Sequence, residues 1–82
     1  MLDLTSLFRD VFDNGALQIG LQSTPKDVPG WDSYNHLRLA LALEEASGLS
    51  FSSEEISGMA NVEAIVRILA AQGVEIAPLS AE

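Results

Sequence analysis

The 82-residue sequence contains no cysteine, a single histidine and only four lysine or arginine residues. Without cysteine the chain can form neither a disulfide framework nor a zinc site built from thiolates. A single histidine also excludes a histidine-rich metal site, so a bound metal ion would need oxygen ligands alone. We therefore expect no resident metal.

The sequence also lacks a long hydrophobic run and a basic segment at its start. Its longest uninterrupted apolar stretch, Leu39 to Leu43, is far too short to cross a bilayer. Residues 1–4 lack the positive charge of a secretory signal, and Asp10 interrupts the apolar positions that follow. These features predict a cytoplasmic protein with no membrane insertion.

Positive charge is scarce. Twelve acidic residues against four basic ones give a formal net charge of −8. A surface of that sign repels nucleic acid and anionic lipid headgroups, so neither is an expected partner. It attracts partners with basic surfaces and keeps copies of the chain apart, so we expect a monomer.

Length and hydropathy indicate one small helical domain. The 82 residues form one domain, and 48% hydrophobic residues are enough for a core. Apolar residues and capping signals predict four helices, at about 3–13, 33–47, 53–58 and 61–72. In the first of these, Asp3 is a suitable N-cap, and Asn14 with Gly15 would end the helix in a left-handed turn.

The other three helices also have local boundary signals. The segment 33–47 follows Asp32 as N-cap, ends at Gly48, and carries leucines on more than one side, which predicts contacts on more than one face. Ser52 with Glu55 has the spacing of a capping box for the third helix. Asn61 is a suitable N-cap for the fourth.

Two stretches lie outside the predicted helices. Leu17, Ile19 and Leu21 alternate with polar or small residues as in a strand, but no second alternating run could pair with them. We expect an extended connection that lays its apolar side chains on the helices. Residues 74–82, with Pro78, are expected to form a loosely held tail. The prediction is an all-α four-helix bundle in residues 1–73, with a long first loop and a short third helix.

Asp32, Ser33 and His36 resemble the residue types of a hydrolase triad, but their spacing does not fit one. Ser33 and His36 are one helical turn apart, and Asp32 is occupied at the helix start instead of lying behind the imidazole. No glycine-rich oxyanion loop accompanies them. We therefore expect no enzyme, and a structural role for His36. Trp31 is expected to anchor the first connection onto the bundle.

Two carboxylate pairs, Glu44–Glu45 and Glu54–Glu55, also fail as an acid–base dyad. Adjacent helical residues point about 100° apart, so the members of a pair do not converge. The pairs form either solvated helix faces or a surface that recognises basic partners.

Ser33 remains as an acceptor for a group delivered by another enzyme. A helix N-terminus favours an anion such as a phosphate, through unpaired N–H groups and the helix dipole. The carboxylate of Asp32 opposes an anion slightly by like charge. The alternative is that Ser33 only reinforces the cap.

The sequence resembles the acyl carrier proteins over nearly its whole length. The matching positions are Gly30-Trp31-Asp32-Ser33-Tyr34, Leu37, Leu39, Ala40, Leu43-Glu44-Glu45, Phe51, Ser53-Glu54-Glu55-Ile56 and Asn61-Val62. The resemblance implies that Ser33 carries 4′-phosphopantetheine, obtained from coenzyme A, and that acyl groups are held as thioesters on that arm. It implies a bundle of acyl-carrier type whose interior, open to acyl chains, is lined by Leu37, Ala40, Leu43, Phe51, Ile56 and Val62.

Two residues depart from the family pattern. Tyr34 replaces the usual leucine after the serine, and Arg38 adds positive charge to a helix that tends to be acidic in such proteins. Both favour a specialised pathway of fatty acid or polyketide-like biosynthesis. The implied partners are a phosphopantetheinyl transferase and the enzymes that load and transfer acyl or aminoacyl groups. Their expected contacts are Asp32, Tyr34, Leu41, Glu44 and Glu54.

Two other functions fit the same residues. One is a peptidyl carrier protein that holds an amino acid. The other is an unmodified helical module that binds a basic partner, for which Ser33 would be dispensable. The residues do not distinguish one cargo from another.

Overall fold

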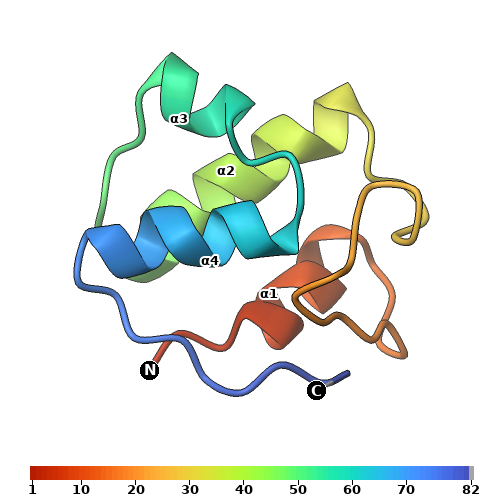
Figure 1. Ribbon diagram of the computed structural model, residues 1–82. Coiled ribbons are helices and arrows are strands. Elements are labelled where there is room, and N and C mark those ends of the chain that lie inside the picture. Colours follow the sequence, from red (N-terminus) through yellow and green to blue (C-terminus); the bar gives the residue numbers. More distant parts are fainter. Residues whose placement is uncertain (82) are drawn as a thin grey trace.

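The computed structural model describes residues 1–81 and consists of four helices joined by loops (Figure 1). They are α1 (Leu4–Val11), α2 (Ser33–Ser47), α3 (Ser53–Ser57) and α4 (Val62–Ala71). This confirms the predicted all-α fold, including the long first connection and the short α3. Between residues 1 and 81 no helix combines the length and apolar character that spanning a membrane requires.

Each helix begins at the capping residue expected from the sequence. In every case a side-chain oxygen accepts a hydrogen bond from the backbone N–H three residues on, which satisfies a donor that the helix itself leaves free. The four pairs are Asp3 with Ser6, Asp32 with Asn35, Ser52 with Glu55, and Asn61 with Ala64. Ser52 and Glu55 form the complete capping box.

The helix ends were predicted less well. Gly48 closes α2 in the left-handed conformation, with φ of 75°. The left-handed residue after α1 is Asp13, with φ of 48°, and not Gly15. Aspartate tolerates this conformation better than most residues because its short side chain forms local hydrogen bonds. The next turn is held by the side chain of Asn14, which accepts from the N–H of Ala16.

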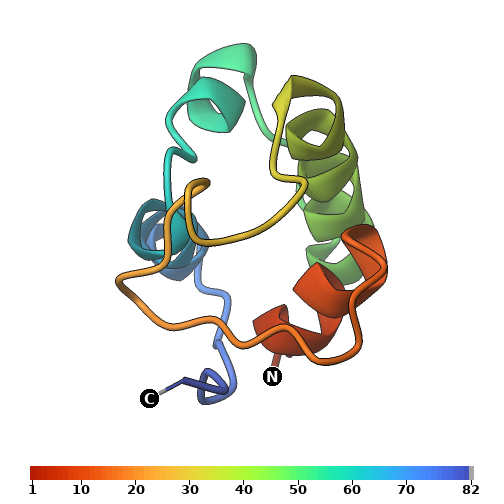
Figure 2. The same ribbon diagram turned by 90° about the vertical axis from the view of Figure 1, so that its right-hand side faces the viewer.

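Aromatic residues hold the long first connection against α1. Trp31 is buried, and its ring meets that of Phe8 edge-on at 5.3 Å between centroids and lies 6.1 Å from that of Phe12. Trp31 therefore anchors the connection, as expected. Figure 2 shows this connection crossing the bundle, with α2 and α4 on opposite sides.

The helix α2 is buried on one face only. Leu39, Ala40 and Leu43 are fully buried, whereas Leu37 and Leu41 are 53% and 57% exposed. The expectation that α2 contacts other helices on more than one face is therefore wrong, as is the placement of Leu37 in the interior. The bundle is too small for another element to cover the outer side of α2. Of the other expected interior residues, Ala40, Leu43, Phe51 and Val62 are buried, and Ile56 packs against the core.

The C-terminal segment is not loosely held over its described residues. Leu2 and Ile76 form a parallel bridge, and Leu79 is buried in the core. The hydroxyl of Ser80 accepts a hydrogen bond from the N–H of Ile19 at 2.9 Å, and the carbonyl of Ile19 accepts one from the N–H of Ala81 at 2.9 Å. The tail thus provides hydrogen-bond partners for the extended connection, for which the sequence alone showed no pairing segment. Glu82 lies outside the described residues.

Candidate functional site

Ser33 is the first residue of α2 and is exposed. Two hydrogen bonds, one to Asp32 and one to Gly30, fix the turn before it. Asp32 Oδ1 accepts from the N–H of Asn35 at 2.8 Å, and the side-chain amide of Asn35 donates to the carbonyl of Gly30 at 2.8 Å. Gly30 has φ of 89°, which a residue with a side chain rarely adopts. These contacts present the hydroxyl of Ser33 to solvent from a defined backbone.

No residue at this site activates Ser33 for attack. None of the hydrogen bonds found within residues 1–81 involves its hydroxyl. Both ring nitrogens of His36 are engaged elsewhere: Trp31 Nε1–H donates to Nδ1 at 2.9 Å, and Nε2 lies 2.8 Å from the carbonyl oxygen of Ile56. Because indole is only a donor, Nδ1 is unprotonated and Nε2–H donates to Ile56.

His36 therefore links three parts of the chain. Its ring stacks on Trp31 at 6.1 Å with an interplanar angle of 17°. Through Ile56 it ties the end of the first connection and the first turn of α2 to α3. The structural role expected for His36 is confirmed, but its two partners lie in different elements and were not predictable from local spacing.

A hollow of about 390 Å³ opens beside Ser33. Its wall combines apolar side chains of Trp31 and Met59 with polar groups of Asp32, His36 and Ser57. It lies between the start of α2 and the segment that joins α3 to α4, so a group on the Ser33 hydroxyl has a surface to lie against. No cluster of three acidic or histidine side chains suited to a metal ion occurs within residues 1–81.

Four of the five expected partner contacts are open to solvent. Asp32 and Glu54 are exposed, Tyr34 is 72% exposed, and Leu41 is 57% exposed. Glu44 is different, because it is half-buried and its Oε2 accepts from the N–H of Phe51 at 2.7 Å. That carboxylate ties the end of α2 to the segment before α3.

Two further residues complete this face. Leu37, which the family resemblance places in the interior, is exposed beside Tyr34 and Leu41 on successive turns of α2. The guanidinium of Arg38 lies 5.9 Å from the centre of the Tyr34 ring and donates to the carbonyl of Val11 and to Asn35 Oδ1. The face is therefore aromatic and aliphatic, with one anchored positive charge.

Comparisons with known proteins show a similarity to a solved structure. No protein-family model matches the chain, and no curated protein matches it. Among solved structures, it is similar to the solution NMR structure of holo acyl carrier protein from Geobacter metallireducens. The two share 28% sequence identity with a TM-score of 0.76, over 83% of this chain and 78% of the other.

The fold, helix order and sequence all agree with that similarity. Four helices follow in the expected order, with Asp32 and Ser33 at the start of the second. The structural match extends over most of both chains, well beyond one helical motif. Over most of its length the chain therefore resembles an acyl carrier protein in fold and helix order.

Proposed function

We propose that this protein is a discrete carrier protein whose Ser33 is loaded with 4′-phosphopantetheine and which holds acyl groups as thioesters on that arm. The observation that carries the proposal is the exposed Ser33 hydroxyl on the first residue of α2, beside an open hollow. The similarity to a holo acyl carrier protein supports the same assignment.

The groups around Ser33 fit a phosphodiester. The hydrogen bonds found within residues 1–81 leave the Ser33 hydroxyl unused. The N–H groups of the first helical turn face an incoming phosphate, and the positive end of the helix dipole favours its charge. The carboxylate of Asp32 opposes this, but its Oδ1 is already engaged by the N–H of Asn35.

Loading needs a phosphopantetheinyl transferase with Mg²⁺ and coenzyme A. The Ser33 oxygen forms a new bond to the phosphorus that bears pantetheine, and the pyrophosphate bond of coenzyme A breaks. Adenosine 3′,5′-bisphosphate leaves, and the hydroxyl proton passes to a base of the transferase. When bound, the arm supplies a thiol for thioester formation. This chain contributes position, because tethering gives the cargo a high effective concentration at a docked enzyme.

Intact-mass measurement tests the proposal. The protein is incubated with coenzyme A, Mg²⁺ and a promiscuous transferase, and the gain of one phosphopantetheine is expected. Ser33→Ala should gain nothing and should keep the fold. Ser53→Ala is the matched control, because Ser53 is the exposed first residue of α3, directly after the cap Ser52. Absence of a mass gain in the unsubstituted protein, or a gain that persists in Ser33→Ala, contradicts the proposal.

The exposed face of α2 is the proposed docking surface for the transferase and the acyl-handling enzymes. It comprises Asp32, Tyr34, Leu37 and Leu41, with Glu54 on α3. Glu44 contributes less than expected because its carboxylate is held by Phe51. Substituting Leu41 by Ser should slow loading without unfolding the chain, because a side chain with 57% exposure contributes little to the core.

Tyr34 and Arg38 support a partner set of a specialised pathway of fatty acid or polyketide-like biosynthesis. Tyr34 directly follows Ser33, Arg38 lies five residues beyond it, and the guanidinium of Arg38 lies above the Tyr34 ring. Tyr34 and Arg38 give partners an aromatic and positively charged surface, whereas the family pattern has a leucine after the serine and an acidic second helix. Charging the loaded protein with candidate acyl and aminoacyl donors distinguishes an acyl carrier from a peptidyl carrier.

A further inference from the structure

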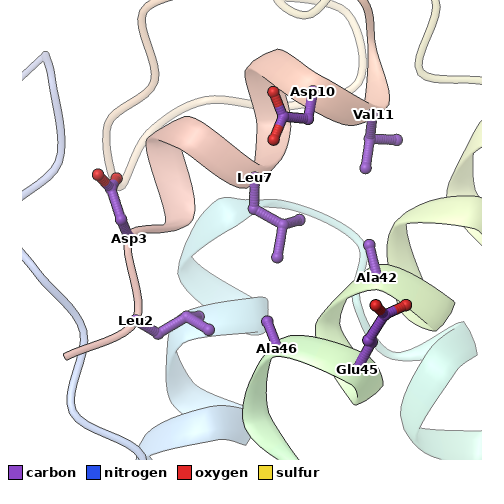
Figure 3. A pocket seen from close by; sticks show the side chains of 8 residues that line it. All are labelled: Leu2, Asp3, Leu7, Asp10, Val11, Ala42, Glu45 and Ala46. Atoms are coloured by element: carbon purple, nitrogen blue, oxygen red, sulfur yellow. The ribbon is translucent and has the colours of Figure 1, made fainter.

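An open groove runs between α1 and α2 on the side away from the core. Its volume is about 440 Å³, and its apolar floor is formed by Leu2, Leu7, Val11, Ala42 and Ala46. Figure 3 shows Leu7 pointing from α1 toward the two alanines of α2. The hollow exists because Ala42 and Ala46, one turn apart on α2, are too small to fill the space opposite α1.

Three carboxylates surround this floor. Asp3, Asp10 and Glu45 are all exposed and line the groove, and Figure 3 shows them spread around it instead of converging on one point. Asp3 is held in its charged form, because hydrogen bonds from the backbone N–H and the hydroxyl of Ser6 lower its pKa. The groove is therefore apolar at its centre and negative at its edges.

Within residues 1–81 the chain's own basic residues form no ion pair with these carboxylates, although the charge of Arg9 helps to lower the pKa of Asp3. Within residues 1–81 the only ion pair joins Arg67 to Glu63 on α4. Arg9 donates to the carbonyl of Leu17, and Lys26 lies in the first connection. Arg38 reaches one end of the groove, where it donates to the carbonyl of Val11. Asp10 and Glu45 form no ion pair within residues 1–81, so a basic partner can supply complementary charge at these two edges.

We propose that the α1–α2 groove docks a basic amphipathic segment of a partner protein, with apolar side chains on the floor and lysine or arginine against the carboxylates. The groove is separate from the loading site, because Glu45 lies twelve residues beyond Ser33, about 18 Å along the axis of α2. Charge complementarity favours this occupant over the others. A second copy of the chain brings a net charge of −8, and an acyl chain brings no basic group.

The test uses a synthetic helical peptide of leucine and lysine with one apolar stripe, added to the whole protein. Binding is followed by NMR shifts of the methyl groups of Leu7, Ala42 and Ala46. Saturable shifts centred on these residues are expected, and they should weaken as salt is added. A peptide with glutamate in place of lysine, or serine in place of leucine, should not bind.

Matched variants locate the site. Glu45→Lys should weaken binding by about fivefold or more, since an attraction becomes a repulsion. Glu63→Lys changes the charge by the same amount on the exposed face of α4 and should leave the affinity within about twofold. Ala46→Gln, which places a polar side chain on the floor, should weaken binding, whereas Ala70→Gln on α4 should not.

Other outcomes overturn the proposal. Equal loss of affinity in Glu45→Lys and Glu63→Lys would show unspecific attraction to the acidic surface. Groove shifts on dilution of the protein alone would identify a second copy as the occupant. Groove shifts on attaching an acyl chain at Ser33 would identify the cargo. The peptide test does not depend on loading, so its failure leaves the role of Ser33 untouched.

Discussion

Replacing His36 by alanine should destabilise the whole bundle, although the side chain is not in the apolar core. The imidazole accepts a hydrogen bond from Trp31 Nε1 at 2.9 Å and donates one to the carbonyl of Ile56 at 2.8 Å, both in partly buried surroundings. No other residue bridges the first connection, α2 and α3 in this way within residues 1–81.

The expected loss follows from these two bonds. A hydrogen bond of this kind contributes about 1 kcal/mol net, so His36→Ala should lower the free energy of unfolding by about 2 kcal/mol. A domain of this size has a total stability of roughly 4–12 kcal/mol, so the loss is a large fraction. Trp31→Phe keeps a ring against Phe8 but removes the N–H, and should cost about 1 kcal/mol through the lost bond alone.

Urea unfolding followed by circular dichroism measures these free energies. In the double variant, the effects of His36→Ala and Trp31→Phe should overlap by about 1 kcal/mol, because both remove the same bond. Leu37→Gln is the control: its side chain is 53% exposed on the same helix, so its effect should stay within about 0.5 kcal/mol. The reasoning is refuted if His36→Ala unfolds at the same urea concentration as the parent, or if the two effects are strictly additive.

Two further predictions concern α1 and the tail. The N–H and hydroxyl of Ser6 lower the pKa of Asp3 below its ordinary value of 3.8, so the cap's contribution is complete above that value and is lost as pH falls through the lower folded-state pKa. In Ser6→Ala the NMR titration midpoint of Asp3 should move part of the way back to 3.8, and an unchanged midpoint would contradict this assignment. Leu79→Ala should cost about 2–3 kcal/mol of unfolding free energy because Leu79 is buried, whereas Pro78→Ala, at an exposed position, should cost less than about 0.5 kcal/mol. Equal urea midpoints for Leu79→Ala and Pro78→Ala would contradict this and support a loosely held tail.

Features set by neighbouring residues were predictable from the sequence. The caps at Asp32, Ser52 and Asn61 depend on a side chain and an N–H three residues away, and all three form as expected. The exposed position of Ser33 follows from the first of them. The left-handed turn after α1 was misplaced because Asp13 competes with Gly15 for it, and local sequence rules favour glycine too strongly.

Features set by distant residues were not predictable. Leu37 is a large apolar residue of the kind that fills cores, and it is exposed because no other element covers that side of α2. Glu44 belongs to an acidic pair, yet the N–H of Phe51 engages its carboxylate. The α1–α2 groove depends on two alanines facing another helix, a relation that helical periodicity within one segment does not contain.

The hydrogen bonds of Ser80 also constrain the order in which the chain can fold. They join Ser80 to Thr5 and Ile19, across 75 and 61 positions of sequence. During synthesis α1 and the first connection emerge long before Ser80, while the helix caps can form as soon as each helix is complete. The bundle cannot make these contacts until Ser80 and Ala81 have left the ribosome. Until then the helices can form, but the N–H and the carbonyl of Ile19 lack the hydrogen bonds that Ser80 and Ala81 supply in the folded chain.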